Sequence, residues 1–385
     1  MKKILIIILS LSVCINIFMI IPTHATEIDL APNALSAYLI EYNSGKVIYA
    51  KHETDRLYPA SMTKMMGLLL LYEAHQAGKL KWSDKVTTSE LAASMGGSQV
   101  FLEVNETMSA RDLLKAICIA SANDAMVAIG EMIAGSNEHF VERMNEKGKA
   151  LKLTNTNFVN ATGLHDPKHY SCAKDMAIIA KALIEVGGKD LLSVTSKYDA
   201  YIREKSDKKF WLVNTNKLLK QYPGVDGLKT GFTQEARSCI TVSAKKDNLR
   251  LISVVMGEPN SKMRNTESKQ MLDYGFSQFS TGILMNKNKI IQKLTFDKGK
   301  PKHANLRLKD DVTYLFEKGK EAKERKRKIE LLNGNVPFKK GDVIGSVNIE
   351  MDNGYKIKTD LYIDSDIIAL NYFDILLKSI KRILS

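Results

Sequence analysis

Residues 58–66 of the chain read YPASMTKMM, which places a serine and a lysine three positions apart at the start of an apolar run. The run continues to Gly78, so we expect a helix that begins at Ser61 and ends there. Residues three apart on a helix face the same way, which puts Lys64 beside Ser61. A hydroxyl needs a base to become a nucleophile, and a lysine kept neutral by burial can be that base.

The same spacing has a simpler interpretation, in which Ser61 is only the N-cap of its helix. Serine–lysine pairs with this spacing are common in proteins. Three more occur in this chain: Ser171/Lys174, Ser206/Lys209 and Ser243/Lys246. The spacing alone therefore does not distinguish a nucleophile from a cap.

Two further motifs make the catalytic interpretation specific. SAN, residues 121–123, ends an expected helix over residues 110–121, and KTG, residues 229–231, begins an expected strand. S-x-N occurs again at Ser346 and Asn348, whereas KTG occurs once. The ordered set S-x-x-K, S-x-N and K-T-G, on helix, helix and strand, is the motif set of the penicillin-binding proteins and serine β-lactamases.

The three motifs form a coherent site for acyl transfer. Ser61 would attack an acyl carbon with Lys64 as its general base. Ser121 would pass a proton between Lys64 and the leaving amine. The backbone N–H groups of Ser61 and Phe232 are the expected oxyanion hole.

The remaining motif positions are suited to substrate binding. Asn123 can bind a substrate amide and hold the lysine in place. Lys229 and Thr230 offer a cation and a hydroxyl to a terminal carboxylate. Gly231 has no side chain, so a substrate backbone can approach and pair along the edge of the strand.

Strand-like segments near both ends of the first 280 residues predict one antiparallel sheet. Residues 34–52 alternate around NSG, as in a hairpin, and KTGFT, SCITVSA and LRLISVVMG are typical of successive strands. Helical stretches lie between them, at residues 124–133 and 171–188, and RNTESKQMLDYGF indicates a closing helix. We therefore expect an α+β fold, an antiparallel sheet flanked by helices, over residues 26–280.

The chain changes character after residue 280. Lysine becomes dense, and strand-like runs such as VIGSVNIEM and YKIKTDLYI predict a small all-β domain over residues 281–362. The basic run at residues 317–328 is interpreted as solvated surface, with contact to an anionic polymer as the alternative.

Residues 363–385 are expected to form an amphipathic helix that anchors the protein to a membrane surface, with docking onto its own domain as the alternative. One helical face carries apolar side chains: Leu370, Phe373, Leu377, Ile380 and Leu384. The opposite face is polar and basic: Asn371, Asp374, Lys378, Lys381 and Ser385, with Arg382 beside them.

The N-terminus predicts export. Residues 1–25 combine Lys2 and Lys3 with an apolar stretch and small residues before Thr26, which is typical of a cleaved signal peptide. The net charge of +13 suits anionic surroundings such as lipid headgroups or wall polymers. The sequence has neither zinc-finger spacing nor an RNA-binding signature. We expect the protein at the outer face of the cytoplasmic membrane, with no nucleic-acid partner.

The cysteine and histidine pattern predicts neither a disulfide framework nor a metal site. Three cysteines remain after cleavage, and an odd number argues against a set of disulfides. Cys118 and Cys239 lie in apolar runs and are expected to be buried. The seven histidines are scattered without ligand spacing, so we expect no metal and no other cofactor.

Longer stretches extend the resemblance over nearly the whole mature chain. GKVIYAKHETDRLYPASMTKMM, GSQVFLE, NATGLHD, YSCAKDMA, GVDGLKTGFT and ESKQMLDYGF resemble the low-molecular-weight penicillin-binding proteins, the serine D-alanyl-D-alanine carboxypeptidases. FKKGDVIGSV resembles their C-terminal β domain, and the final helix resembles their membrane anchor.

This resemblance implies removal of the terminal D-alanine from peptidoglycan stem pentapeptides through an acyl-enzyme on Ser61. It also implies that β-lactam antibiotics trap this serine and that Arg264 helps to hold the substrate carboxylate. Some members have histidine after K-T-G, where this chain has Phe232. The backbone donor is unaffected, but the side-chain role of that histidine has no counterpart here.

Three alternatives share the motif set. A β-lactamase needs a base for rapid deacylation, but no glutamate lies in an E-x-x-x-N context between Asn155 and Glu185, so we expect slow release of penicillin. A D,D-endopeptidase that cuts cross-links uses the same residues, although such members usually lack the second domain and the anchor. A non-catalytic wall-binding scaffold is the third alternative.

Overall fold

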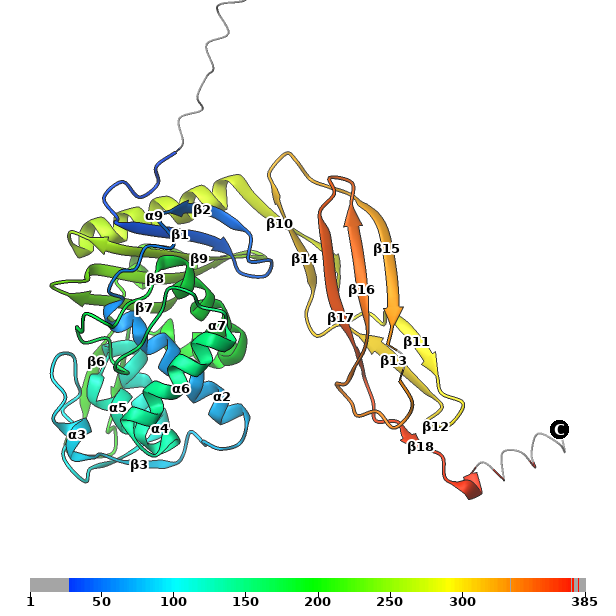
Figure 1. Cartoon of the computed structure of the whole chain (residues 1–385), viewed down its shortest axis with the longest axis horizontal. Helices are drawn as coiled ribbons and strands as arrows, with labels where there is room; N and C mark the ends of the chain where they lie inside the picture. The colour runs from blue at the N-terminus through cyan, green and yellow to red at the C-terminus, as the bar shows by residue number, and fades with distance from the viewer. Residues whose placement is uncertain (1–27, 333, 375, 377–379, 381–385) are drawn as a thin grey trace, which may run out of the picture.

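The computed structural model describes residues 28–332, 334–374, 376 and 380. It shows two bodies beside each other, the first built of a sheet and helices and the second built of strands (Figure 1). The junction is direct, since helix α9 (Ser261–Gln278) is followed at once by strand β10 (Phe279–Met285). Near this junction, Lys318 Nζ donates to the carbonyl oxygen of Phe276 over 2.9 Å.

A five-stranded antiparallel sheet of order β2-β1-β9-β8-β7 forms the centre of the first domain. Its strands are β1 (Ser36–Glu41), β2 (Val47–Lys51), β7 (Val225–Thr233), β8 (Arg237–Lys246) and β9 (Leu249–Glu258). The predicted hairpin and the three late strands are confirmed. The order places β7, which carries the KTG motif, at one edge of the sheet.

Both faces of this sheet are buried, which explains the unbroken apolar runs of β8 and β9. Along β9, Ile252, Val254 and Met256 belong to the core shared with the helices. Leu251 and Val255 belong to the core on the α9 side. The alternation follows the two-residue period of a strand. Helices therefore cover the sheet on both sides, as the α+β prediction states (Figure 1).

The helices between β2 and β7 form the body that packs on one face of the sheet. They are α2 (Lys64–Gln76), α3 (Glu90–Ala93), α4 (Ala110–Lys115), α5 (Asn123–Ala134), α6 (Asn137–Ala150), α7 (Ala173–Thr195) and α8 (Leu218–Gln221). Two short antiparallel strand pairs lie among them: β3 (Lys85–Thr87) with β4 (Thr107–Ser109), and β5 (Asp199–Ile202) with β6 (Phe210–Val213). Helix α6, whose exposed face is mostly polar, and these short strands were not predicted from the sequence.

Three predicted helices differ from the structure in detail. The first does not begin at Ser61, because a 3₁₀ turn, η1 (Ala60–Thr63), precedes α2, and the N-cap of α2 is Thr63. The second changes after α4 into a π-helical segment, η2 (Ala116–Ala120). The last, α7, runs on past a break at Gly188 instead of ending there. The interpretation of Ser61 as a plain helix cap is therefore wrong.

The second domain is all-β, as predicted. A five-stranded sheet of order β11-β13-β17-β16-β15 is accompanied by the pairs β10 with β14 and β12 with β18. The further strands are β11 (Gln292–Thr295), β12 (Gly299–Lys300), β13 (His303–Arg307), β14 (Val312–Glu317), β15 (Glu324–Leu331), β16 (Val343–Met351), β17 (Lys356–Ile363) and β18 (Ile368–Ala369). Pairing of β18 with β12 carries the domain beyond residue 362, where the sequence analysis ended it.

The two termini are described only in part. The predicted signal peptide, residues 1–25, lies outside the described residues. Residues 363–369 end in strand β18 and are not helical, so the predicted C-terminal helix does not begin at residue 363. Helix follows at residues 372–374. Several predicted positions of its two faces lie outside the described residues: Leu377, Lys378, Lys381, Arg382, Leu384 and Ser385. Within the described part of the chain, no helix has the length and apolar character needed to cross a membrane.

A glycine couples the fold to the turn that carries Ser61. Gly163 has a φ of +84°, and a Cβ at this position would lie 1.8 Å from the carbonyl oxygen of Ala60. We predict that Gly163→Ala lowers the free energy of unfolding by at least about 3 kcal/mol, because one of the two backbones must move. Urea unfolding followed by circular dichroism measures this loss.

Gly45→Ala is the matched control for this substitution. Gly45 also has a positive φ, +69°, but a Cβ there would have no described atom within 4 Å. Its replacement should cost only about 1 kcal/mol, the penalty for the left-handed backbone. Equal losses for the two variants would contradict the close packing at Gly163.

Candidate active site

The serine and lysine of the first motif are in direct contact. Ser61 lies in turn η1, and Lys64 is the first residue of α2. Lys64 Nζ donates a hydrogen bond of 2.8 Å to Ser61 Oγ and another of 2.8 Å to the carbonyl oxygen of Thr162. The side chain of Lys64 is fully buried, with 0% exposure. The predicted proximity is therefore present, although a 3₁₀ turn creates it instead of a continuous α-helix.

The surroundings of Lys64 favour its neutral form. Burial lowers its pKa well below the ordinary value of 10.5, and the positive charge of Lys229 lowers it further. The carboxylate of Asp124 acts in the opposite direction. A depressed pKa increases the fraction of neutral amine near neutral pH, and only the neutral amine can accept the proton of a hydroxyl.

The second motif lies where a helix is interrupted. Ser121 ends the π-helical segment η2 with a left-handed backbone, φ +65°, and is almost fully buried. Asn123 begins α5; its Nδ2 donates to the carbonyl oxygen of Gly96, and its backbone N–H donates to that of Ser98, both over 2.7 Å. Asn123 Oδ1 is buried and has no hydrogen-bond partner among the described residues. This oxygen is therefore an acceptor available to a ligand.

Asp124, which the sequence analysis did not single out, holds the loop beside Asn123. Its buried carboxylate accepts hydrogen bonds from the backbone N–H groups of Val100 at 3.0 Å and Leu102 at 3.1 Å. Both groups belong to the loop whose carbonyl oxygens bind Asn123. The signal in the sequence was an aspartate directly after the SAN motif, at the start of an apolar helix. A carboxylate buried there needs several hydrogen-bond donors, which the neighbouring loop supplies.

The third motif packs directly against the turn that carries Ser61. A Cβ on Gly231 would lie 2.7 Å from the carbonyl oxygen of Pro59 and 3.3 Å from Ser61 N. Only glycine permits this approach without displacement of the turn. The requirement for glycine in KTG is therefore a packing requirement as well as one of substrate access.

The other two residues of KTG are held within the protein. Lys229 is buried, with 1% exposure, and its Nζ donates to the carbonyl oxygen of Thr230 over 3.0 Å. Burial lowers the pKa of Lys229 to about 7, and Arg264 contributes to the lowering. Thr230 Oγ1 donates to Thr215 Oγ1 over 2.6 Å.

Thr215 joins the second and third motifs, and the sequence analysis missed it. Its backbone N–H donates to the carbonyl oxygen of Ile119 in η2 over 3.2 Å, while its hydroxyl binds Thr230. Flanking Asn214 and Asn216 fix the loop, since Asn214 Oδ1 accepts from the backbone N–H of Asn216. The sequence NTN gave no sign of this contact, because the loop meets β7 only in the folded chain.

Phe232 and Arg264 differ in the exposure of their side chains. The side chain of Phe232 is 66% exposed, so only its backbone N–H is suited to the oxyanion hole. Arg264 is buried, and its Nε and Nη2 both donate to Asn265 Oδ1. Burial lowers the pKa of Arg264 to about 10. Arg264 is therefore held by its neighbour, close enough to Lys229 for their charges to interact.

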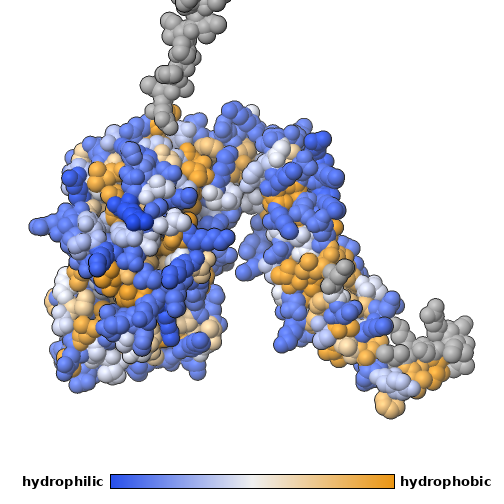
Figure 2. All heavy atoms as spheres, viewed as in Figure 1, coloured by the Kyte–Doolittle hydropathy of each residue, from blue (hydrophilic) through white to orange (hydrophobic). Residues whose placement is uncertain are grey.

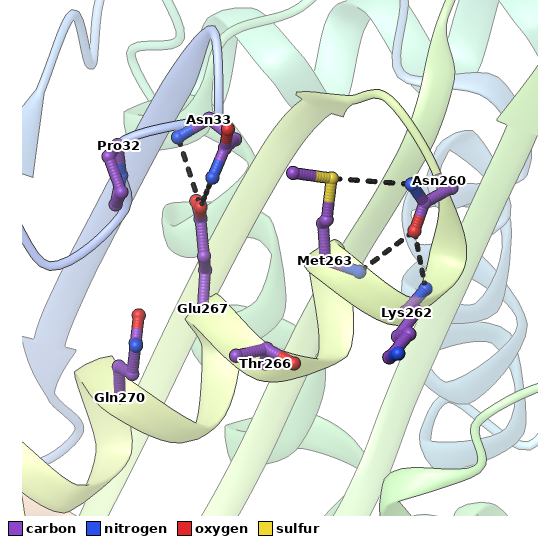
Figure 3. A pocket seen from close by; sticks show the side chains of 8 residues that line it. All are labelled: Pro32, Asn33, Asn260, Lys262, Met263, Thr266, Glu267 and Gln270. Carbon is purple, nitrogen blue, oxygen red and sulfur yellow. Dashed lines mark hydrogen bonds between the residues drawn. The ribbon is translucent and has the colours of Figure 1, made fainter.

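The start of α9, which carries Arg264, is fixed by its cap. Asn260 Oδ1 accepts from the backbone N–H groups of Lys262 and Met263, each over 3.0 Å (Figure 3). One turn later, Glu267 accepts from Asn33 of the N-terminal segment (Figure 3). A pocket of about 350 Å³ lies between these elements, and none of the motif residues lines it.

The part of the chain that the structure describes contains no group of three or more His, Cys, Asp or Glu side chains arranged to hold a metal ion. Cys118, Cys172 and Cys239 are free thiols and buried. The burial predicted for Cys118 and Cys239 is confirmed.

Two family models match this chain, one over each of its two domains. The model of the D-alanyl-D-alanine carboxypeptidase family, peptidase family S11, matches residues 23–260. The model of the C-terminal domain of penicillin-binding protein 5 matches residues 279–368. D-alanyl-D-alanine carboxypeptidase DacF of Bacillus subtilis is 50% identical over 325 residues, which are 84% of this chain and 83% of that protein.

Solved structures agree with this result. Penicillin-binding protein 5 from Haemophilus influenzae superposes with a TM-score of 0.67 at 36% identity, covering 87% of this chain and 98% of that one. Penicillin-binding protein D2 from Listeria monocytogenes in the ampicillin-bound form gives 0.57 at 30% identity, covering 63% and 98%. The chain belongs to the D-alanyl-D-alanine carboxypeptidases of peptidase family S11, the low-molecular-weight penicillin-binding proteins, with the penicillin-binding α+β fold followed by their C-terminal β domain.

Proposed function

We propose that this carboxypeptidase removes the terminal D-alanine from peptidoglycan stem pentapeptides through an acyl-enzyme on Ser61. One observation carries the proposal: Lys64 Nζ lies 2.8 Å from Ser61 Oγ in a fully buried position. Burial favours the neutral amine, which can accept the proton of the hydroxyl as the serine attacks.

The proposed reaction has two steps. Ser61 Oγ attacks the carbonyl carbon of the penultimate D-alanine while Lys64 takes its proton, and the backbone N–H groups of Ser61 and Phe232 stabilise the oxyanion. Ser121 passes the proton to the nitrogen of the departing D-alanine. A water molecule then attacks the ester, with Lys64 as base again, and Ser61 regains its proton.

Substrate binding is assigned to the other motif residues. Lys229, Thr230 and Arg264 would hold the terminal carboxylate, which would favour the charged form of Lys229. Asn123 Oδ1, buried without a partner among the described residues, would accept from a substrate amide. The outer edge of β7 would pair with the extended peptide backbone.

The ampicillin-bound relative supports inhibition of this chain by β-lactams. Such a molecule would acylate Ser61 as the peptide does. The segment between Asn155 and Glu185 contains no glutamate that could activate a deacylating water. We therefore propose that the penicilloyl-enzyme persists.

The site of action is proposed to be outside the cytoplasm, at the membrane surface. The described C-terminal residues lie at the end of the β domain away from the α9–β10 junction (Figure 1). Exposed apolar side chains gather there (Figure 2): Ile368, Tyr372, Phe373, Leu376 and Ile380. A segment of this kind can enter the interface of a bilayer. The β domain would then lie between the membrane and the catalytic domain and act as a spacer.

Ser61→Ala tests the nucleophile. Wild-type full-length protein should gain one penicillin adduct by intact-mass spectrometry and release D-alanine from a diacyl-D-Ala-D-Ala peptide, whereas Ser61→Ala should do neither. Ser206→Ala, at an exposed serine that also precedes a lysine by three positions, is the matched control and should behave as wild type. An adduct on Ser61→Ala would remove Ser61 from the mechanism, and an adduct without D-alanine release would indicate a scaffold.

Lys64→Arg tests the base. Arginine keeps a positive charge at all accessible pH values and cannot accept the proton of Ser61. The rate of acylation by penicillin should fall by at least about 100-fold, the usual contribution of a general base. Lys174→Arg, at the exposed lysine of another serine–lysine pair, should leave the rate unchanged. Stopped-flow acylation that is equally fast in Lys64→Arg would rule out Lys64 as the base.

A further inference from the structure

A buried histidine outside the three motifs links the two segments that surround Lys64. His169 is only 2% exposed and lies in the loop before α7. Its Nε2 is 2.8 Å from Thr63 Oγ1, in the turn between Ser61 and Lys64. On the other side of the ring, Nδ1 accepts from the backbone N–H of Val159 at 3.1 Å and of Asn160 at 3.4 Å.

These contacts define the protonation state of the ring. Two backbone N–H groups point at Nδ1, so this nitrogen must be the unprotonated acceptor. Nε2 then carries the proton and donates it to Thr63 Oγ1. Burial keeps the ring neutral by lowering its pKa from 6.5 to about 4.

The segment held by Nδ1 leads to the other partner of Lys64. Asn160 Oδ1 accepts from the backbone N–H groups of Thr162 at 3.1 Å and Gly163 at 2.7 Å. This arrangement presents the carbonyl oxygen of Thr162 to Lys64 Nζ. His169 therefore holds both the turn that precedes Lys64 and the loop that supplies the second hydrogen bond of Lys64.

We propose that His169 is a positioning residue for the reaction: its neutral ring fastens the Ser61–Lys64 turn to the Thr162 loop. This keeps the Lys64 amine aligned with Ser61 Oγ and shielded from water. The inference rests on the proposed function in one respect, since it takes Lys64 as the base. It gives a task to a residue that touches neither the substrate nor the reacting atoms.

The charged and titratable groups around the ring are consistent with this task. Asp166 raises the pKa of His169, whereas His165 from the same loop and Lys64 from α2 lower it. The ring of Phe158 packs edge-on against the imidazole, with centroids 5.8 Å apart. Burial outweighs the carboxylate and holds the pKa of His169 at about 4, so the ring is neutral at pH values well above this.

Three substitutions at His169 itself separate the two hydrogen-bonding functions of the ring. His169→Asn keeps an acceptor near the position of Nδ1, and His169→Gln keeps a donor near that of Nε2, because the two amides reach different distances from the backbone. His169→Phe keeps an aromatic ring but neither function. Thr63→Val removes the partner hydroxyl with little change in shape, and the Thr63→Val/His169→Phe double variant completes a cycle.

The readout is the rate of penicillin acylation per active site, titrated by intact mass, as a function of pH. His169→Phe and Thr63→Val should each slow acylation by about tenfold, because small displacements of reacting groups cost this much or more. The double variant should be no slower than either single one. The acid limb of the profile should move to higher pH, because water that reaches Lys64 raises its pKa. His169→Asn and His169→Gln should fall between wild type and His169→Phe.

A purely structural role gives a different result. In that case the variants would lower the melting temperature and the fraction of active sites, but the rate per active site and its pH profile would match wild type. That outcome would overturn the proposal. It differs from a failure of the proposed function, in which the wild-type chain itself would not be acylated on Ser61.

The protonation state gives a second test, on the pH dependence of stability. Since the pKa of His169 is about 4 in the folded chain and 6.5 ordinarily, the unfolded chain binds the additional proton first as the pH falls. As the pH falls from 6.5 to about 4, the free energy of unfolding of wild type should decrease more than that of His169→Phe. Above and below this range, the plots of unfolding free energy against pH should run parallel for the two proteins. The unfolding free energies are measured by urea unfolding at each pH. If the two plots against pH run parallel over the whole range, the neutral state of the buried ring is contradicted.

Discussion

The contact between Lys64 Nζ and Ser61 Oγ is the constraint on which the site depends. A charged ammonium group in a fully buried position costs several kcal/mol of solvation, so burial shifts the amine toward its neutral form. The same burial removes water that would compete for the amine. The Lys64 amine has a hydroxyl 2.8 Å away and the Thr162 carbonyl oxygen as its second partner. In the proposed mechanism, the costly burial of this lysine is therefore also what would make it a base.

The fold supplies this arrangement by packing backbone against backbone around a short turn. On one side of η1, Gly231 of β7 leaves no space for a Cβ beside Pro59. On the other side, Gly163 lies still closer, since a Cβ there would be 1.8 Å from the carbonyl oxygen of Ala60, whose own φ is positive at +47°. Two glycines from distant parts of the sequence therefore confine the turn that carries Ser61. The sheet provides rigidity, since β7 is paired with β8 without interruption from Gly227 to Thr233.

The motifs made much of the fold and site predictable, because each combines a residue type with a local structure. S-x-x-K placed Ser61 and Lys64 together, and the alternating residues 34–52 with the later apolar runs predicted the strands of the sheet. Contacts made only in the folded chain were not predictable: Thr215 reaches Thr230 from a loop, and His169 reaches Thr63 across a gap in sequence of about a hundred residues. The π-helical segment before Ser121 was also missed, since hydrophobic periodicity does not distinguish it from α-helix.

Titration of the Lys64 amine by NMR, in full-length protein with isotope-labelled lysine and Lys64→Arg for assignment, tests the central claim most directly. The structure predicts that this amine titrates well below the ordinary value of 10.5, because its side chain is fully buried. Addition of penicillin, which removes the serine hydroxyl as a partner, should change the signal of Lys64 and not that of Lys174. A Lys64 amine that stays protonated up to pH 10 would contradict its assignment as the neutral base, whatever the rate of the enzyme.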